Sequence, residues 1–365
     1  MRLRVGTAIR WLFTLGAVAV LIHVVDWGRF AENVRTADFR LLLVAYGLYL
    51  FDRLQMSFKW GLLLHRRGLH VPFWENWSIY SLSALSATVL PATLGADMLR
   101  GMWVWRRTGN GAAATASIVV ERLVGFVIGL AVACVAAFYL VWRNQGALGL
   151  KDLLVTMAVL LGVAVVAVGA SFSRRVSTPI ARILERRSGS RVSRMAHKLG
   201  SAYVAYRDAP GLLAWFALLT VLEQLTSLFM GYLVAVAVGV EVGFLTFAAA
   251  LAVALLVSRL PIAVDGIGVL EGLLVLLLNF AGVPPAESVA FALVGRFMNV
   301  LGFAPGAAVA MTALDLRPGD LRRAATQGEN PGATAPVSPQ RLKGRPSGAP
   351  PSESEAGRRR PAPPR

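Results

Sequence analysis

Long apolar runs alternate with short polar segments along most of the chain. A helix needs about 20 apolar residues to cross a hydrocarbon core about 30 Å thick. Six runs approach or exceed that length: 9–25, 39–64, 112–142, 153–172, 211–238 and 288–314. Four shorter runs form two pairs, 74–90 with 94–105 and 244–260 with 267–281, and proline and glycine stand where the members of each pair meet. The pattern predicts an all-α polytopic membrane protein with six spanning helices and two re-entrant helical hairpins. A count of eight spans is the alternative.

The two hairpins share a motif at their tips. Pro-x3-Gly-x-Asp-x2-Arg runs from Pro91 to Arg100, and Pro-x4-Gly-x-Gly-x2-Glu begins at Pro261 and ends at Glu271. Each copy is followed by an apolar run, a glycine break and a long helix that carries an arginine. Gly/Pro-interrupted segments at matching places in two halves point to the substrate site of a transporter-like fold. The sequence therefore predicts an inverted repeat.

Loop charge predicts the orientation and the domain limits. The segments 65–70, 106–107 and 173–209 are basic, whereas 26–38 and 143–152 are mixed in charge. Because cytoplasmic loops collect Lys and Arg, we expect both termini in the cytoplasm, the first hairpin entering from that side and the second from the other. The membrane domain would occupy residues 1–315, with a basic cytoplasmic loop at 173–209 that is helical in part. Residues 316–365 read as a disordered, basic, Pro/Gly-rich cytoplasmic tail.

Composition narrows the class of function. The chain is 56% hydrophobic and carries a formal charge of +17. The positive charge lies in loops and tail, which argues against nucleic acid as a partner. The single cysteine, Cys134, excludes an intrachain disulfide, and the four histidines show no metal-ligand spacing. We expect no metal, no cofactor and no enzymatic activity.

Charged residues inside the apolar runs are the candidates for function. A charge at the bilayer centre costs about 2.5–3.5 kcal/mol on insertion scales, so it persists when paired, facing a cavity or functional. Glu121 and Arg122 are neighbours on one helix and point about 100° apart, so each needs a partner elsewhere. We expect Arg100 and Glu271 to pair where the hairpin tips meet near the midplane.

The remaining charges fit around that pair. Arg122 and Arg296 would flank a common cavity, and Glu223 would compensate one of them. Asp52 and Lys59 stand toward the ends of their span, where snorkelling to the interface explains them.

Spare arginine charge in a membrane cavity suits a phosphate headgroup. Guanidinium groups bind phosphate bidentately, half-helix N-termini favour anions, and glycine allows close approach. The predicted headgroup-binding residues are Arg100, Arg122, Glu271, Arg296, Asp97, Glu223, Gly95, Gly266 and Gly268. The alternative for all of them is that buried ion pairs only hold the helices together.

Several of these motifs resemble one known family. The motif ending at Arg100, Glu121-Arg122-Leu123-x-Gly125, the second-hairpin motif, and Gly282-Val-Pro284 before Arg296 are similar to the lysylphosphatidylglycerol synthase transmembrane family. These flippase-like proteins are related to the membrane half of the multiple peptide resistance factor. Lys59-Trp60-x2-Leu63-Leu64 resembles the family's Arg-Trp-x2-Leu-Leu, with Lys in place of Arg.

The resemblance covers about residues 5–315 and implies a bacterial inner-membrane protein that moves a lipid between leaflets. In full-length resistance factors a soluble aminoacyl-transferase domain follows the membrane half, whereas only about fifty residues follow Leu314 here. We therefore expect a separately encoded enzyme to make the lipid.

Three functions compete at this point. A lipid flippase or scramblase, with membrane lipids bearing a phosphate headgroup as its partners, fits the charged repeat best. A non-transporting accessory subunit of a lipid or envelope pathway is the second reading. A membrane enzyme acting on lipid phosphates is the third, and it lacks the clustered His/Asp or metal-binding groups that such chemistry needs.

Overall fold

The computed structural model describes residues 25–89, 93–143, 150–172, 203–259 and 266–313, with single positions at 16, 19, 22, 23 and 200. Within these ranges the regular structure is entirely α-helical apart from one short 3-10 turn, as the sequence predicts. The helices are α2 Trp27–Arg35, α3 Phe39–Arg66, α4 Phe73–Val89, α5 Thr93–Thr108, α6 Gly111–Arg143, α7 Leu150–Phe172, α10 Pro210–Ala237, α11 Phe244–Ser258, α12 Val269–Asn279 and α13 Pro285–Ala313.

Long apolar helices form the frame of the molecule. Four of them are long and apolar enough to cross a membrane, at Gly111–Arg143, Lys151–Ala170, Pro210–Ala237 and Pro285–Thr312. Helix α3 matches α10 in length at 28 residues, but it carries charged side chains in its interior. These five helices correspond to five of the six predicted spans, which makes the chain a multi-pass membrane protein. The first predicted span, 9–25, lies almost wholly outside the described residues.

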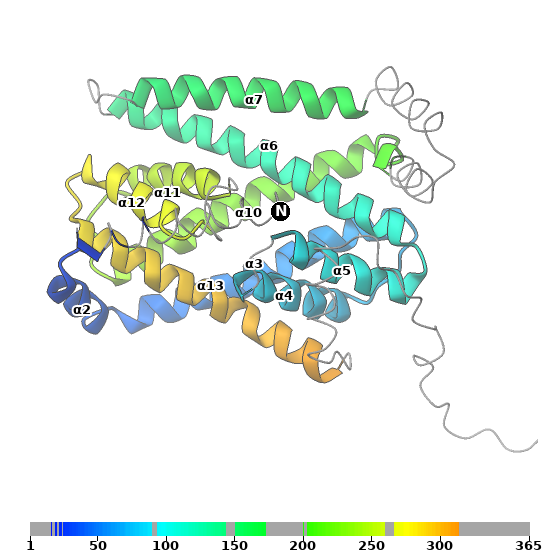
Figure 1. Cartoon of the computed structure of the whole chain (residues 1–365), viewed down its shortest axis with the longest axis horizontal. Helices are drawn as coiled ribbons and strands as arrows, with labels where there is room; N and C mark the ends of the chain where they lie inside the picture. The colour runs from blue at the N-terminus through cyan, green and yellow to red at the C-terminus, as the bar shows by residue number, and fades with distance from the viewer. Residues whose placement is uncertain are drawn as a thin grey trace, which may run out of the picture. The chain divides into compact units, whose positions relative to one another are not determined.

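The two short helix pairs occupy opposite ends of the bundle (Figure 1). Helices α4 and α5 pack against each other in one half of the bundle, and α11 and α12 do so in the other half. Each pair turns back near the middle, so each forms a hairpin about half as deep as the long helices. This arrangement agrees with the predicted hairpins of opposite orientation. The tip residues 90–92 and 260–265, which include Pro91, Pro261 and Asp265, lie outside the described residues.

The helix boundaries show that the two halves repeat. Helix α10 begins 171 residues after α3 (210 against 39), and α11 begins 171 residues after α4 (244 against 73). After the tips the offset changes, because α13 begins 174 residues after α6 (285 against 111). The second hairpin therefore contains three more residues than the first between these landmarks.

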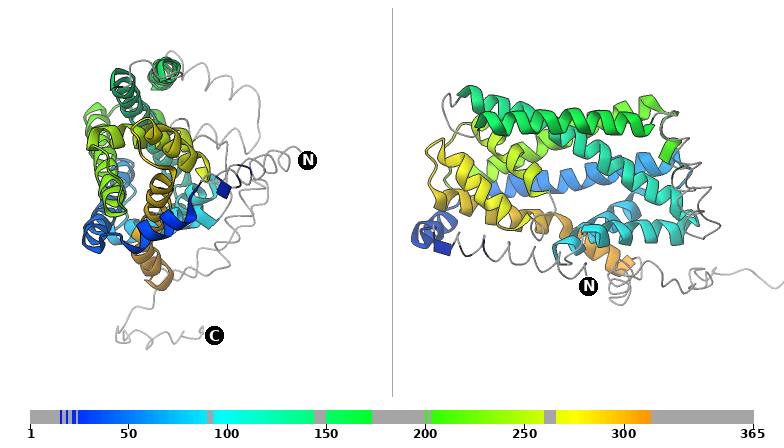
Figure 2. Two further views of the ribbon diagram at one scale, coloured as in Figure 1. Left: turned by 90° about the vertical axis from the view of Figure 1, so that its left-hand side faces the viewer. Right: turned by 45° about the horizontal axis from the view of Figure 1, so that its top comes forward.

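The repeat is also visible in the packing. The first hairpin packs on α13 through α4, and the second hairpin packs on α6 through α11, so each hairpin lies against the long helix of the other half. Helices α3 and α10 pack on each other. Helix α7 stands at the margin beside α6 and outside this exchange (Figure 2). Each half therefore depends on the other to bury its hairpin.

Other predictions fall on undescribed parts of the chain. The basic loop at 173–209 is described only at residue 200 and from residue 203 onward, and the tail at 316–365 not at all. Their predicted helicity and disorder remain predictions.

Candidate functional site

An ion-pair cluster built on Asp97 holds the first hairpin to α6. Asp97, on α5, accepts hydrogen bonds from Arg122 on α6 at 3.0 and 2.9 Å and from Arg100 at 3.2 and 2.9 Å. Arg100 also forms an ion pair with Glu121 at 2.7 Å. Glu121 and Arg122 thus find separate partners, as predicted from their positions on the helix.

Arg100 is enclosed on all sides. Its guanidinium lies 4.8 Å from the ring centroid of Trp60 and 4.9 Å from that of Tyr80. The Tyr80 hydroxyl donates a 2.9 Å hydrogen bond to Glu121. Arg100 is only 2% exposed. In this conformation its role is to join the hairpin to α6, and a ligand has no access to its guanidinium.

The second hairpin carries a simpler cluster around Glu271. One Glu271 oxygen accepts a hydrogen bond from the backbone N–H of Gly268 at 2.7 Å, and the other accepts one from Arg296 on α13 at 3.0 Å. Gly266 and Gly268 have φ of +66° and +82°, which side-chain-bearing residues rarely adopt. A Cβ on Gly266 would also lie 2.8 Å from the backbone oxygen of Ser258. These glycines therefore shape the turn, and Glu271 caps the helix that follows it.

The predicted ion pair between Arg100 and Glu271 is wrong. Each residue pairs within its own half, and no ion pair joins the two. The reason is the longer second hairpin, since aligning Arg100 with Glu271 extends the offset of 171 past the tip. With the offset of 174, Glu271 matches Asp97 and Arg296 matches Arg122. Both of these acid–arginine pairs are separated by 25 residues.

Helices α3 and α10 contribute a third charged group at the middle of the bundle. The Lys59 ammonium pairs with Glu223 and also donates to the hydroxyl of Thr220 at 3.1 Å. Asp52 pairs with Arg53 at 2.9 Å, and both are almost fully buried. Snorkelling therefore does not explain Asp52 and Lys59, because both face the bundle interior rather than its ends. Glu223 compensates Lys59, not Arg122 or Arg296.

Sequence reasoning missed two interior cations. Arg53 lies between α3 and α13, where it donates to the Asn299 side chain and its guanidinium stands 3.9 Å from the Phe303 ring centroid. Arg259 ends α11 at the second tip, and it lies within electrostatic range of Glu223, Arg122 and Tyr80. Both arginines stand inside long apolar runs, which is the signal that would have found them.

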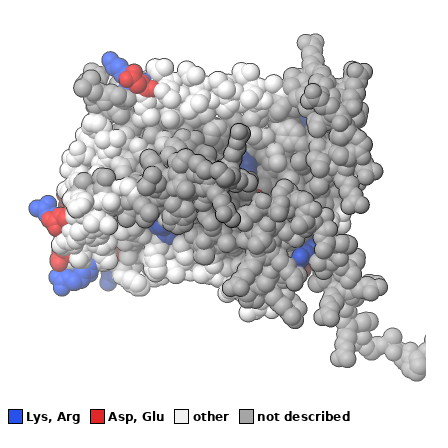
Figure 3. Space-filling view, viewed as in Figure 1, with Lys and Arg blue, Asp and Glu red and all other residues white. Residues whose placement is uncertain are grey.

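The clusters differ in how far they open to solvent. The Arg122 side chain is 63% exposed, against 3% for Arg100 and 26% for Arg296. On the face drawn in Figure 3 a few basic side chains appear in the middle, away from the charged groups at the edge. Gly95, predicted as a turn residue, lies in α5. In the described ranges no three His, Cys, Asp or Glu side chains gather as metal ligands.

A comparison with family models now identifies the chain. Residues 7–306 match the model for the lysylphosphatidylglycerol synthase TM region. The chain belongs to this family. The match covers the described helices except the end of α13, so the hairpins and the three charged clusters are parts of a lysylphosphatidylglycerol synthase TM region. No curated protein matched the chain.

Proposed function

We propose that this chain is a lipid flippase or scramblase that moves an anionic, phosphate-bearing lipid between leaflets. The carrying observation is the set of six ion pairs inside a bundle of apolar helices, with the guanidinium of Arg122 open on one side. Buried charge that only fastened helices together would be enclosed throughout, as Arg100 is. An open arginine beside a fixed carboxylate supports passage of a phosphate headgroup.

The repeat supports transport rather than catalysis. Inverted repeats with half-depth helices allow one half to move against the other around a central site, which opens alternately to the two faces. Here Asp97 with Arg122 and Glu271 with Arg296 stand at matching places in the two halves. Closing one cluster while the other opens would carry a headgroup across, with its acyl chains left in the bilayer.

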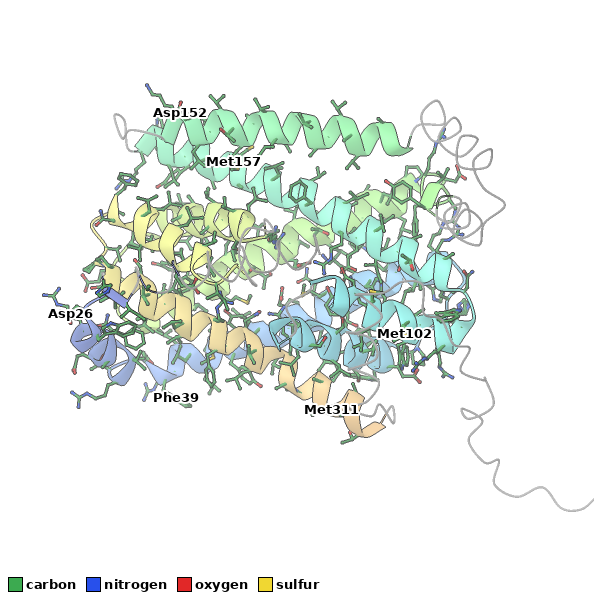
Figure 4. The ribbon with its side chains drawn as sticks, in the orientation of Figure 1. Asp26, Phe39, Met102, Asp152, Met157 and Met311 are labelled. Carbon is green, nitrogen blue, oxygen red and sulfur yellow. The ribbon has the colours of Figure 1, made fainter. Side chains whose placement is uncertain are left out.

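We further propose a bacterial inner-membrane location with both termini in the cytoplasm. The end of the bundle formed by the C-termini of α3 and α5 and the N-terminus of α10 is basic, with Arg66, Arg67, Arg106, Arg107 and Arg207. Asp26 and Asp152 lie together at the opposite end, away from Met102 (Figure 4). By the positive-inside rule the basic end faces the cytoplasm. A separately encoded enzyme would supply the lipid, and the chain itself would bind membrane lipids and no nucleic acid.

The test is transport by the purified protein in liposomes. Vesicles would contain headgroup-labelled phosphatidylglycerol or phosphatidylcholine, and an impermeant quencher would report the label in the outer leaflet. We expect faster exchange of the anionic lipid, lost in Arg122→Ala and kept in Arg107→Ala. Arg107 is the matched control because it pairs with Glu75 at the exposed basic end. Exchange no faster than in empty vesicles, with folded protein, would reject the proposal.

A further inference from the structure

Arg259 is the one interior cation of the described helices that has no ion pair. Six cations lie in the interior clusters, and five of them pair with a carboxylate. They are Arg53, Lys59, Arg100, Arg122 and Arg296. Arg259 makes neither an ion pair nor a side-chain hydrogen bond with the residues described around it. An unpaired charge in a membrane protein is costly and therefore points to a functional role.

The repeat makes Arg259 more unusual. The residue 171 positions earlier, at the matching place of the first hairpin, is the uncharged Thr88. The same offset relates Asp52 to Glu223 and Arg53 to Gln224, so polar groups elsewhere in α3 and α10 have polar counterparts. Arg259 thus breaks the symmetry of the charged interior. A residue needed only to stabilise the shared architecture would be expected in both halves.

Gln224 and Arg259 converge on a bare patch of α6. A Cβ placed on Gly129 would lie 3.0 Å from the Gln224 side-chain nitrogen and 3.3 Å from a guanidinium nitrogen of Arg259. The three residues line a cavity of about 10 Å³ between α6, α10 and α11, closed elsewhere by aliphatic side chains such as Leu256. Two nitrogen donors therefore face one small space, and neither hydrogen-bonds to a protein acceptor described here.

The surrounding charge favours an anion in that space. Glu223, the carboxylate nearest along α10, is already paired with Lys59. Arg122 adds a second positive group within electrostatic range of Arg259. A cavity of this size holds one water or one oxygen of a larger group. One phosphate oxygen could occupy it while a second contacts the outer edge of the Arg259 guanidinium.

We infer that Arg259, Gln224 and the bare surface at Gly129 form a binding site for the phosphate of a lipid headgroup. The inference rests on the proposed function for the source of that phosphate, and it names the residues that bind it. Arg259 supplies the charge, Gln224 a directed hydrogen bond, and Gly129 the room. Binding here would place the headgroup midway along α6 and α10, next to the open face of Arg122.

Direct lipid binding tests the site without any transport step. Detergent-purified full-length protein would be titrated with phosphatidylglycerol, phosphatidylcholine or inorganic phosphate, and bound lipid would be read by native mass spectrometry alongside thermal stabilisation. We expect Arg259→Gln to weaken phosphatidylglycerol binding by about tenfold or more, because a charge-assisted contact is lost. Gly129→Ala should weaken it too, since the added methyl group fills the space between the two donors.

Gly125→Ala is the matched control for Gly129→Ala. Gly125 lies one turn earlier on α6, and a Cβ there meets nothing within 4 Å. Normal binding by Gly125→Ala with weak binding by Gly129→Ala would support the site even if Arg259→Gln folds poorly. Unchanged phosphatidylglycerol binding in folded Arg259→Gln and Gly129→Ala would overturn it. Inorganic phosphate that stabilises wild type as well as the lipid does would show an anion site that is not lipid-specific, which contradicts the headgroup assignment.

The outcome separates this site from the proposed function. Transport that persists in both variants, with unchanged lipid binding, would remove the site and leave the flippase proposal standing. Site-dependent lipid binding with no transport by wild type would keep the site and remove the flippase proposal.

Discussion

Asp97 on α5 accepts two hydrogen bonds from Arg122 on α6, at 3.0 and 2.9 Å, across a sequence separation of 25 residues. The same separation joins Glu271 to Arg296 in the second half. Each pair ties a hairpin helix to the long helix that follows it. Asp97 has the heavier duty, because it also holds Arg100.

Neutralising Asp97 should damage both folding and transport. In Asp97→Asn the buried Arg100 loses one of its two carboxylates, and Arg122 loses the anion that fixes it. We expect a lower melting temperature in detergent and slower lipid exchange. The control is Glu75→Gln, which breaks an ion pair with the half-exposed Arg107 and should leave both measurements unchanged. Equal melting temperatures for the two variants would contradict this account of Asp97.

The Lys59–Glu223 pair should show strong coupling. Removing one partner of a buried pair costs about 3–5 kcal/mol, because the other charge is left unpaired, whereas removing both costs less. We therefore expect Lys59→Met and Glu223→Gln each to destabilise the protein more than the double variant does. Unfolding followed by denaturant titration in detergent measures all four proteins of the cycle. Additive effects would show that the two side chains do not interact.

Gly266→Ala should distort the tip of the second hairpin. Gly266 has φ +66°, and an added Cβ would lie 2.8 Å from the Ser258 backbone oxygen. Backbone strain of this kind costs about 1–3 kcal/mol. Gly272→Ala is the matched control, because a Cβ at Gly272 on α12 meets nothing within 4 Å. Thermal unfolding of the two variants, together with lipid exchange, tests the prediction. A Gly266→Ala variant as stable as Gly272→Ala would show that the tip relaxes freely.

The proposed orientation predicts which loops react from outside the cell. Cys134 is the single cysteine, so a Cys134→Ser protein gives a clean background. Cysteines replacing the exposed Glu32 and Lys151 should react with an impermeant maleimide in intact cells. Cysteines replacing Arg106 and Asp208 should react only after the membrane is opened. The reverse pattern would invert the topology, and reaction of all four in intact cells would show that the ends are not separated by a membrane.

The sequence by itself determined the class of protein and the position of its hairpins. Runs of apolar residues long enough to span a bilayer leave little alternative to membrane helices, because the backbone must satisfy its own hydrogen bonds there. Proline and glycine between short runs then marked the two hairpins. The charges at Asp97, Arg122, Glu271 and Arg296 stood out because charge is expensive in such surroundings.

Only the tertiary structure decided which charges meet. Partner choice depends on the register between helices far apart in the chain, and the three additional residues of the second hairpin moved that register. Arg100 consequently pairs with Glu121 and Asp97 instead of Glu271. Lys59 reaches Glu223 because α3 packs on α10, a contact between residues 164 positions apart that local sequence does not encode. Arg259 stands out for the same reason, since the lack of a partner is visible only once every neighbouring helix is in place.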